Sequence, residues 1–220
     1  MAIEGFIKAA SEVAKEAAKE ASKETARNIK SFDVRKKMDS PGPNTDNLKG
    51  PDSKKEKINI DKRIEKLQSE YINKAELNPD LNKLDSQAKG NYAEMKVDRD
   101  LASKGYERIS KESVTDLKTN TGPGIDGVFT NAETGKTVIT EVKFNKSELG
   151  NTLDGKQMSR NWIDKRLDAA VGKEAADKIR MNSILNPDSV ESVLAKVDLN
   201  GNISYFKLDD AANIVGGITL

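Results

Sequence analysis

Apolar side chains recur every three or four residues in the first part of the chain, a spacing typical of an amphipathic helix. We expect one long helix over residues 1–31, on a stripe of Ile3, Phe6, Ile7, Ala10, Val13, Ala14, Ala17 and Ala21. The stripe is mostly alanine and buries little area, so the helix would be marginal alone. We expect it to pack against a partner helix or a carrier, and a membrane-active role remains open.

A polar segment separates this helix from the next apolar stripe. Proline, asparagine, aspartate, serine and glycine dominate residues 31–57, as in a linker. A second helical stretch follows and ends at Asn78-Pro79, with one face made of Ile60, Ile64, Leu67, Tyr71 and Ile72. The pattern therefore predicts three regions: a helix and linker over 1–56, a helical connector over 57–85 and a compact domain over 86–220.

Within the compact domain the hydrophobic period alternates between helix and strand, which indicates a mixed α/β (α+β) fold. Helices are expected over 84–104, where Gly105 provides the stop, over 156–171, and over a short stretch that ends near Asn186-Pro187. Strands are expected over 106–110, 125–130, 137–144, 193–199 and 203–208. Turn chemistry at 131–136 and at Asn200-Gly201 predicts two hairpins.

Composition then narrows the possible chemistry. The 220 residues include no histidine and no cysteine. This excludes Ser-His-Asp and Cys-His catalysis, zinc clusters, haem ligation and disulfides. Any metal must bind through oxygen, which favours magnesium, manganese or calcium. The formal net charge of +1 gives no global sign of a nucleic-acid or membrane partner.

Three charged residues on the predicted 125–144 hairpin form the main candidate site. Its turn places Asp126 beside Glu141 on the neighbouring strand, and Glu141 and Lys143 share one face because side chains alternate. Two adjacent carboxylates can bind a divalent cation, which would activate water and stabilise charge on a phosphate. The alternative is an exposed strand face with a cross-strand ion pair.

Gly122-Pro-Gly124-Ile-Asp-Gly127 has the letters of a dinucleotide-binding fingerprint. That motif functions between a strand and a helix whose N-terminus receives the pyrophosphate. Here a polar segment precedes it and a hairpin follows, so we do not assign it to a nucleotide cofactor.

The order of the acidic residues along the chain resembles that of the PD-(D/E)XK nuclease superfamily, in particular that of the toxin-type nuclease domains of bacterial contact-dependent and other polymorphic toxins. Glu94 matches the family's helical acid, Asp126 its strand aspartate, and Glu141 and Lys143 its Glu-x-Lys pair. Gln157 resembles the glutamine that opens the following helix, although Asn161 stands where some members have tyrosine. The resemblance covers about residues 86–210.

The resemblance implies a restriction-endonuclease-like core with a central mixed sheet flanked by helices. It also implies a Mg²⁺ or Mn²⁺ ion held by Asp126, Glu141 and Glu94, with Lys143 and Gln157 positioning water and phosphate. Basic residues outnumber acidic ones between Lys156 and Arg180, so the expected nucleic-acid contacts are Lys146, Lys156, Arg160 and Lys165. A charge-rich solvated helix face is the alternative reading of this segment.

These observations lead us to expect a Mg²⁺- or Mn²⁺-dependent DNA endonuclease that acts as an interbacterial toxin, with DNA favoured over RNA. We expect a cognate immunity protein, a carrier or secretion component that engages the N-terminal helix, and no membrane span. Without the apolar block of a signal peptide, the chain is expected to be made in the bacterial cytoplasm and delivered to a target-cell cytoplasm. A phage or mobile-element nuclease and a non-catalytic adaptor remain alternatives.

Overall fold

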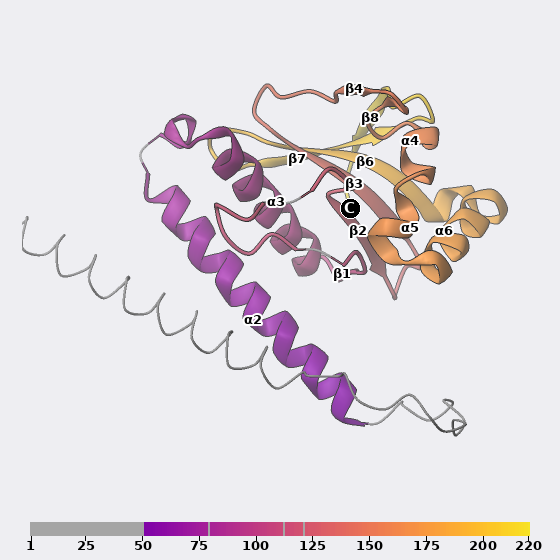
Figure 1. Ribbon diagram of the computed structural model, residues 1–220, viewed down its shortest axis with the longest axis horizontal. Helices are drawn as coiled ribbons and strands as arrows, with labels where there is room; N and C mark the ends of the chain where they lie inside the picture. Colours follow the sequence, from indigo (N-terminus) through magenta and orange to yellow (C-terminus); the bar gives the residue numbers. More distant parts are fainter. Residues whose placement is uncertain (1–50, 79, 112, 121) are drawn as a thin grey trace, which may run out of the picture. The chain divides into compact units, whose positions relative to one another are not determined.

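Runs of helices and runs of strands follow one another along residues 51–220, which the computed structural model describes except for residues 79, 112 and 121 (Figure 1). The helix expected over 1–31 and most of the expected linker lie outside the described residues. The described elements are α2 (Pro51–Glu76), η1 (Leu81–Lys83), α3 (Ser86–Ser103), β1 (Tyr106–Arg108), β2 (Gly127–Asn131), β3 (Thr137–Phe144), β4 (Asn151–Thr152), β5 (Gly155–Lys156), α4 (Arg160–Asp164), α5 (Leu167–Val171), α6 (Lys173–Leu185), η2 (Pro187–Ser189), β6 (Val190–Val197), β7 (Ile203–Leu208) and β8 (Ile214–Ile218).

A six-stranded mixed sheet forms the centre of this region, in the order β1-β2-β3-β6-β7-β8. Only β3 and β6 pair in parallel, from Thr137 opposite Val190 to Phe144 opposite Val197. The other neighbours are antiparallel. A parallel pair needs a crossover connection, and the segment from β4 to η2 provides it. The expected mixed α/β fold with a flanked central sheet is confirmed at this level.

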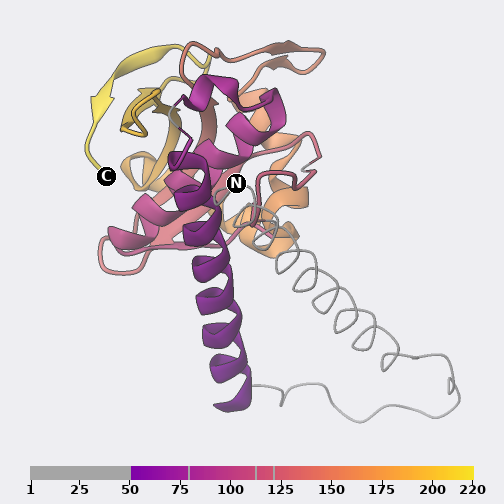
Figure 2. The same ribbon diagram turned by 90° about the vertical axis from the view of Figure 1, so that its left-hand side faces the viewer.

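The sheet buries an apolar layer on each face, because side chains alternate along its strands. Val138 and Phe144 of β3 belong to the core shared with α2 and α3. Ile139, the residue after Val138, belongs to the second core with Trp162 and Leu167 from α4 and α5. Figures 1 and 2 show the sheet between these two groups of helices. Strand β3 therefore lies in the interior, where a charged side chain needs a specific partner.

The expected 84–104 helix and the 125–144 hairpin are both confirmed, within a few residues at their ends. The Asp85 carboxylate caps α3 by accepting the Ala88 N–H at 2.8 Å. Gly105 follows the helix with φ of 81°, a left-handed conformation that glycine adopts without steric penalty. Thr130 pairs with Thr137 across the turn at residues 131–136. Local sequence signals were sufficient for these elements because their boundaries depend on short-range chemistry.

The single helix expected over 156–171 is wrong. The short β4–β5 hairpin precedes two helices, α4 and α5, of five residues each. Met158 has φ of 66°, which a right-handed helix cannot accommodate, so α4 starts only after Ser159. The expected inward residues are nevertheless buried: Met158, Trp162, Ile163 and Leu167. The apolar spacing correctly predicted which side chains are buried, but it did not predict that the helix is interrupted.

Two further elements differ from the expectation. Helix α2 begins at Pro51, within the segment that composition assigned to the linker. Proline is favoured in the first turn of a helix, where its missing N–H has no helical partner to lose. Strand β8 was not expected, because Gly216 and Gly217 interrupt its apolar pattern.

Gly201 provides a test of how the β6–β7 turn packs on the helices. It has φ of 77°, and a Cβ atom there would lie 2.6 Å from the Tyr92 hydroxyl oxygen. Gly135 has a similar φ of 70° but open space around it. We expect Gly201→Ala to lower the free energy of unfolding by about 2 to 4 kcal/mol, through backbone strain plus overpacking, and Gly135→Ala by only about 1 kcal/mol. Urea unfolding measures both, and equal losses would contradict the close approach.

Candidate active site

The central hairpin brings Asp126 beside Glu141, as the sequence predicted. Gly127, the first residue of β2, pairs with Thr140 of β3, so the residues on either side of this pair are neighbours. The Val142 N–H donates a hydrogen bond to Asp126 Oδ2 at 2.8 Å. This bond fixes one carboxylate oxygen of Asp126 against the strand that carries Glu141.

Lys143 and Glu141 form an ion pair on one face of β3, with Nζ 2.8 Å from Oε1. Glu141 is buried, with 2% of the residue exposed. Its second oxygen, Oε2, is also buried and has no hydrogen-bond partner among the described residues. A buried carboxylate oxygen without a partner is energetically unfavourable. The exposed-strand alternative for these residues is therefore wrong.

Glu94 approaches the same site from the middle of α3. Its carboxylate interacts electrostatically with those of Asp126 and Glu141, and with the Arg108 guanidinium. Glu94 also lines a cavity together with Asp126. Helix α3, the residue just before β2 and strand β3 thus contribute one acid each to the same region.

Burial and mutual repulsion raise the pKa of all three carboxyl groups. Burial raises the pKa of Glu94 to about 9, and the Asp126 charge adds to the effect. The pKa of Glu141 rises to about 8 for the same two reasons, although Lys143 opposes the shift. Burial raises the pKa of Asp126 only to about 6, because the Val142 N–H, Lys143 and Arg108 stabilise its charge. Bringing a cation among them would favour all three charged forms.

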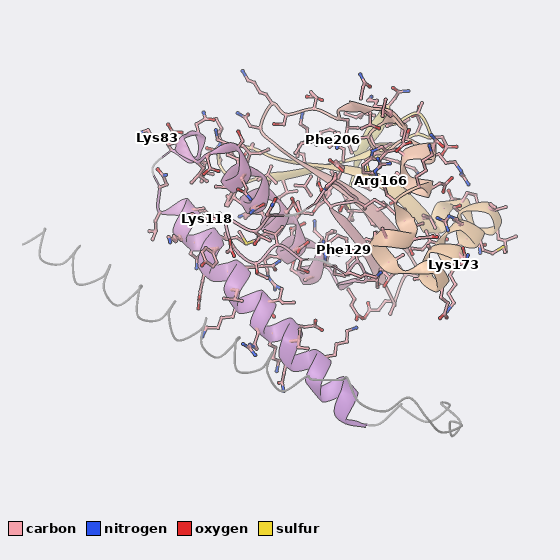
Figure 3. The ribbon with its side chains drawn as sticks, viewed as in Figure 1. Lys83, Lys118, Phe129, Arg166, Lys173 and Phe206 are labelled. Atoms are coloured by element: carbon pink, nitrogen blue, oxygen red, sulfur yellow. The ribbon has the colours of Figure 1, made fainter. Side chains whose placement is uncertain are left out.

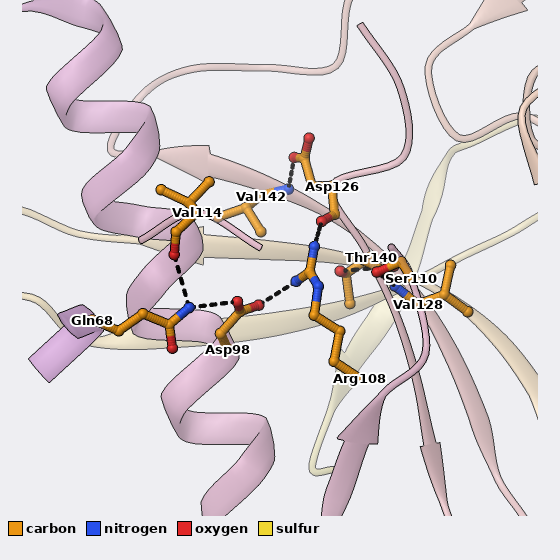
Figure 4. A network of polar contacts seen from close by, with 10 residues as sticks. Gln68, Asp98, Arg108, Ser110, Val114, Asp126, Val128, Thr140 and Val142 are labelled. Atoms are coloured by element: carbon orange, nitrogen blue, oxygen red, sulfur yellow. Dashed lines mark hydrogen bonds and ion pairs between the residues drawn. The ribbon is translucent and has the colours of Figure 1, made fainter. Parts of the chain in front are cut away.

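A buried polar network fixes the main chain at Asp126 (Figure 4). The Arg108 guanidinium donates from Nη2 to the Asp126 main-chain oxygen and from Nη1 to Asp98 Oδ1, both at 2.5 Å. Gln68 of α2 donates to the other Asp98 oxygen at 2.8 Å and to the Val114 carbonyl at 2.9 Å. The sequence analysis singled out none of Gln68, Asp98 and Arg108. Their role depends on contacts between residues far apart in the chain, so no local motif could have revealed it.

The donors at this site fit an oxygen-binding divalent cation. Glu141 Oε2 is a buried acceptor that has no partner in the described part of the chain, and the neighbouring Asp126 and Glu94 offer further carboxylate oxygens. Within the described part of the chain, however, no three acidic side chains are already grouped closely enough to hold a metal ion. The residue types therefore suit Mg²⁺ or Mn²⁺, while a ligand set that includes all of Asp126, Glu141 and Glu94 remains a prediction.

Gln157 occupies a different position from the one expected. It precedes α4 in a loop and does not open a helix. Its side-chain oxygen accepts the Gly150 N–H at 2.7 Å, and its own N–H donates to the Gly150 carbonyl at 2.8 Å. These contacts pin Gln157 to the segment before β4. The expected role in positioning phosphate stays a prediction.

Most of the expected nucleic-acid contacts have partners within the protein. Lys156 donates to the Ala212 carbonyl at 2.7 Å, and Lys165 pairs with Asp154 at 2.6 Å. Arg160 lies 3.9 Å from Asp210, while Lys146 is exposed after β3. The basic excess of this segment is thus largely balanced by acids, and charge along the sequence did not reveal which cations face the candidate site.

The chain matches no family model, no curated protein and no solved structure. The resemblance to the PD-(D/E)XK superfamily therefore rests on the residues themselves. Among the helices that the structure describes, none is long and apolar enough to cross a membrane.

The raised pKa values predict an unusual pH dependence of stability without metal. Between the ordinary glutamate pKa and about 8, the native state holds the Glu141 proton more tightly than the unfolded state does. Stability must then fall as pH rises through this window. We expect a loss on the order of 2 kcal/mol between about pH 5 and about pH 8, and a smaller loss in Glu141→Gln.

Urea unfolding in EDTA measures this dependence. Glu133→Gln is the matched control, because Glu133 is an exposed carboxylate in the turn between β2 and β3. It should behave as the parent does. A free energy of unfolding that rises with pH, or an equal slope in all three proteins, would contradict the assignment.

Proposed function

We propose that this protein is a metal-dependent nuclease of the PD-(D/E)XK type that hydrolyses phosphodiester bonds in DNA. The observation that carries the proposal is the buried Glu141 carboxylate. It pairs with Lys143 through one oxygen, lies beside Asp126, and its other oxygen has no hydrogen-bond partner within residues 51–220 as described. A protein interior rarely holds such a group without a functional reason. The order and spacing of Glu94, Asp126 and Glu141 also resemble those of the PD-(D/E)XK superfamily, which supports the proposal.

The side chains that could ligate a metal here offer only carboxylate oxygens, so Asp126 and Glu141 would hold Mg²⁺ or Mn²⁺, and Glu94 would complete the set directly or through water. A cation there would lower the pKa of a bound water and stabilise negative charge on the phosphate. The fixed orientation of Asp126, set by Val142 and Arg108, would keep one ligand in place as substrate arrives.

Lys143 supplies the second chemical function. Its ammonium lies 2.8 Å from Glu141 and can orient the attacking water or neutralise charge on the phosphate. In the hydrolysis, a water oxygen forms a bond to phosphorus and the bond from phosphorus to the leaving sugar oxygen breaks. The water proton passes to solvent, and the leaving oxygen gains a proton. No histidine is available for either transfer.

The toxin role is a further part of the proposal and rests on the family resemblance alone. It includes a cognate immunity protein, a carrier or secretion component that engages residues 1–31, and delivery into the cytoplasm of a target cell. Growth of a bacterial host measures this role. Expression of the full chain should stop growth, and expression of Glu141→Gln should not.

Cleavage of supercoiled plasmid by the full chain tests the nuclease proposal. We expect nicking in Mg²⁺ or Mn²⁺ and none in EDTA, because activation of the water requires the cation. Glu141→Gln and Lys143→Met should each lower the rate by about 100-fold or more, whereas the exposed Glu133→Gln should retain it. No cleavage of DNA under any divalent metal, or full activity in Glu141→Gln, would refute the proposal.

Thermal unfolding separates the nuclease from a non-catalytic adaptor. A ligand that binds only the native state stabilises it by about 2.7 kcal/mol at a concentration of 100 times Kd. We therefore expect Mn²⁺ to raise the Tm of the parent and of Glu133→Gln, and to leave the Tm of Glu141→Gln nearly unchanged. An adaptor would show no Tm shift in any of the three.

A further inference from the structure

A cavity of about 240 Å³ adjoins the candidate active site, and we call it the Arg166 pocket. Its lining includes two acids, Glu94 and Asp126. It also includes three basic residues and a proline: Arg108, Lys111, Arg166 and Pro123. Most of the Gly122–Gly127 segment, whose letters match a dinucleotide-binding fingerprint, also lines this cavity, although no helix N-terminus follows it. Three cationic side chains beside two acids suit a ligand that carries a phosphate and approaches a metal-binding site.

The walls of the Arg166 pocket are held together by hydrogen bonds. The Lys111 N–H donates to the Ala170 carbonyl of α5 at 2.9 Å. Just before it, Ser110 Oγ accepts the Val128 N–H of β2 at 3.1 Å. The segment after β1 is therefore tied to the sheet on one side and to α5 on the other. This gives the pocket a fixed shape before any ligand binds.

Arg166, labelled in Figure 3, lies between α4 and α5 and is held in place by two neighbours. Its guanidinium lies over the Trp162 ring, 4.4 Å from the centroid, and donates to Asp154 Oδ2 at 3.0 Å. Lys111, in contrast, has an exposed side chain at the pocket. The pocket thus combines one pre-organised guanidinium with one lysine that can reach a ligand.

The size and lining of the pocket indicate what it can admit. Its volume of about 240 Å³ is below the range of roughly 300–1,000 Å³ of pockets that enclose a drug-sized molecule. Pro123, Ile125, Ala169 and Ala170 add an apolar surface against which a flat ring can pack. A space of this size suits one base ring outside its stack, with the sugar and phosphate at the open side, and is too small for a paired and stacked base step.

We propose that the Arg166 pocket binds one unstacked nucleotide next to the scissile phosphate, and that the preferred substrate is therefore single-stranded DNA. This inference rests on the proposed nuclease function and specifies its substrate. Lys111 and Arg166 contact the phosphate, and the apolar wall packs against the base. Enzymes that act on a nucleotide outside the helix must supply the energy of unpairing it, and a single strand removes most of that requirement.

Cleavage of one labelled DNA sequence, as a single strand and as a duplex, tests the substrate class. In Mn²⁺ we expect the full chain to cleave the single strand with a kcat/KM about tenfold or more above that of the duplex. Ala169→Leu should lower single-strand cleavage by about tenfold, because the larger side chain occupies the pocket. Its control is Ala102→Leu, an exposed alanine of α3 that is not part of the pocket.

Binding provides a readout that does not depend on turnover. Fluorescence anisotropy with the same strand in the Glu141→Gln background should show several-fold weaker binding when Lys111→Ala is added. It should also show a salt dependence of log K reduced by about one unit. Lys83→Ala, an exposed lysine of η1, should change neither quantity.

The outcomes separate the two proposals. Equal cleavage of duplex and single strand, or no effect of Ala169→Leu on the single strand, would overturn the pocket assignment while leaving the nuclease in place. Retention of the Mn²⁺-induced Tm shift in Ala169→Leu would show that its loss of activity arises in the pocket and not at the acids. Absence of cleavage of both substrates by the parent protein would overturn both proposals.

Discussion

Arg108 connects the helical layer to the candidate site through two charged or polar contacts inside the protein. One nitrogen reaches Asp98 of α3, and another reaches the main-chain carbonyl of Asp126. The ring of Phe129 lies below the guanidinium at 5.3 Å. A buried charge is tolerated only with good partners, and removal of one partner leaves the other uncompensated. The position of Asp126 therefore depends on an ion pair whose other half is on a different element, and Gln68 extends this dependence to α2.

The Arg108 guanidinium also explains how several carboxyl groups can lie close together at the candidate site. Its charge lowers the pKa of both Glu94 and Asp126, against the larger effect of burial. Lys143 has the same effect on the pKa of Glu141. Two fixed cations therefore partly compensate three buried carboxyl groups. Without a bound cation the raised pKa values keep Glu94 and Glu141 mostly protonated at neutral pH, and a divalent cation would favour their charged forms.

Local chemistry in the sequence was enough to predict the elements that carry the acids. Asp85 and Gly105 delimit α3, and alternation along β3 placed Glu141 and Lys143 on one face. These features depend on residues close together in the chain. Backbone conformation at Met158 does not, because its positive φ is sustained by tertiary packing. The apolar spacing there predicted which side chains are buried and could not predict that the helix is broken.

For a related reason, the count of basic and acidic residues along the sequence did not show which cations face the candidate site. The segment from Lys156 to Arg180 has a basic excess, but ion pairs are made in space, and Asp154 alone pairs with both Lys165 and Arg166. Of the cations that line the acidic site, Arg108 and Lys111 lie near the end of β1, outside that segment, and only Arg166 lies within it. A nucleic-acid site needs only a few correctly placed cations, since phosphate contacts act locally under physiological screening. Without histidine, the functions of base, ligand and phosphate anchor must be divided among carboxylates, lysine and arginine. Those residue types are common on any protein surface, so their burial and mutual geometry distinguish this site, and both are properties of the fold.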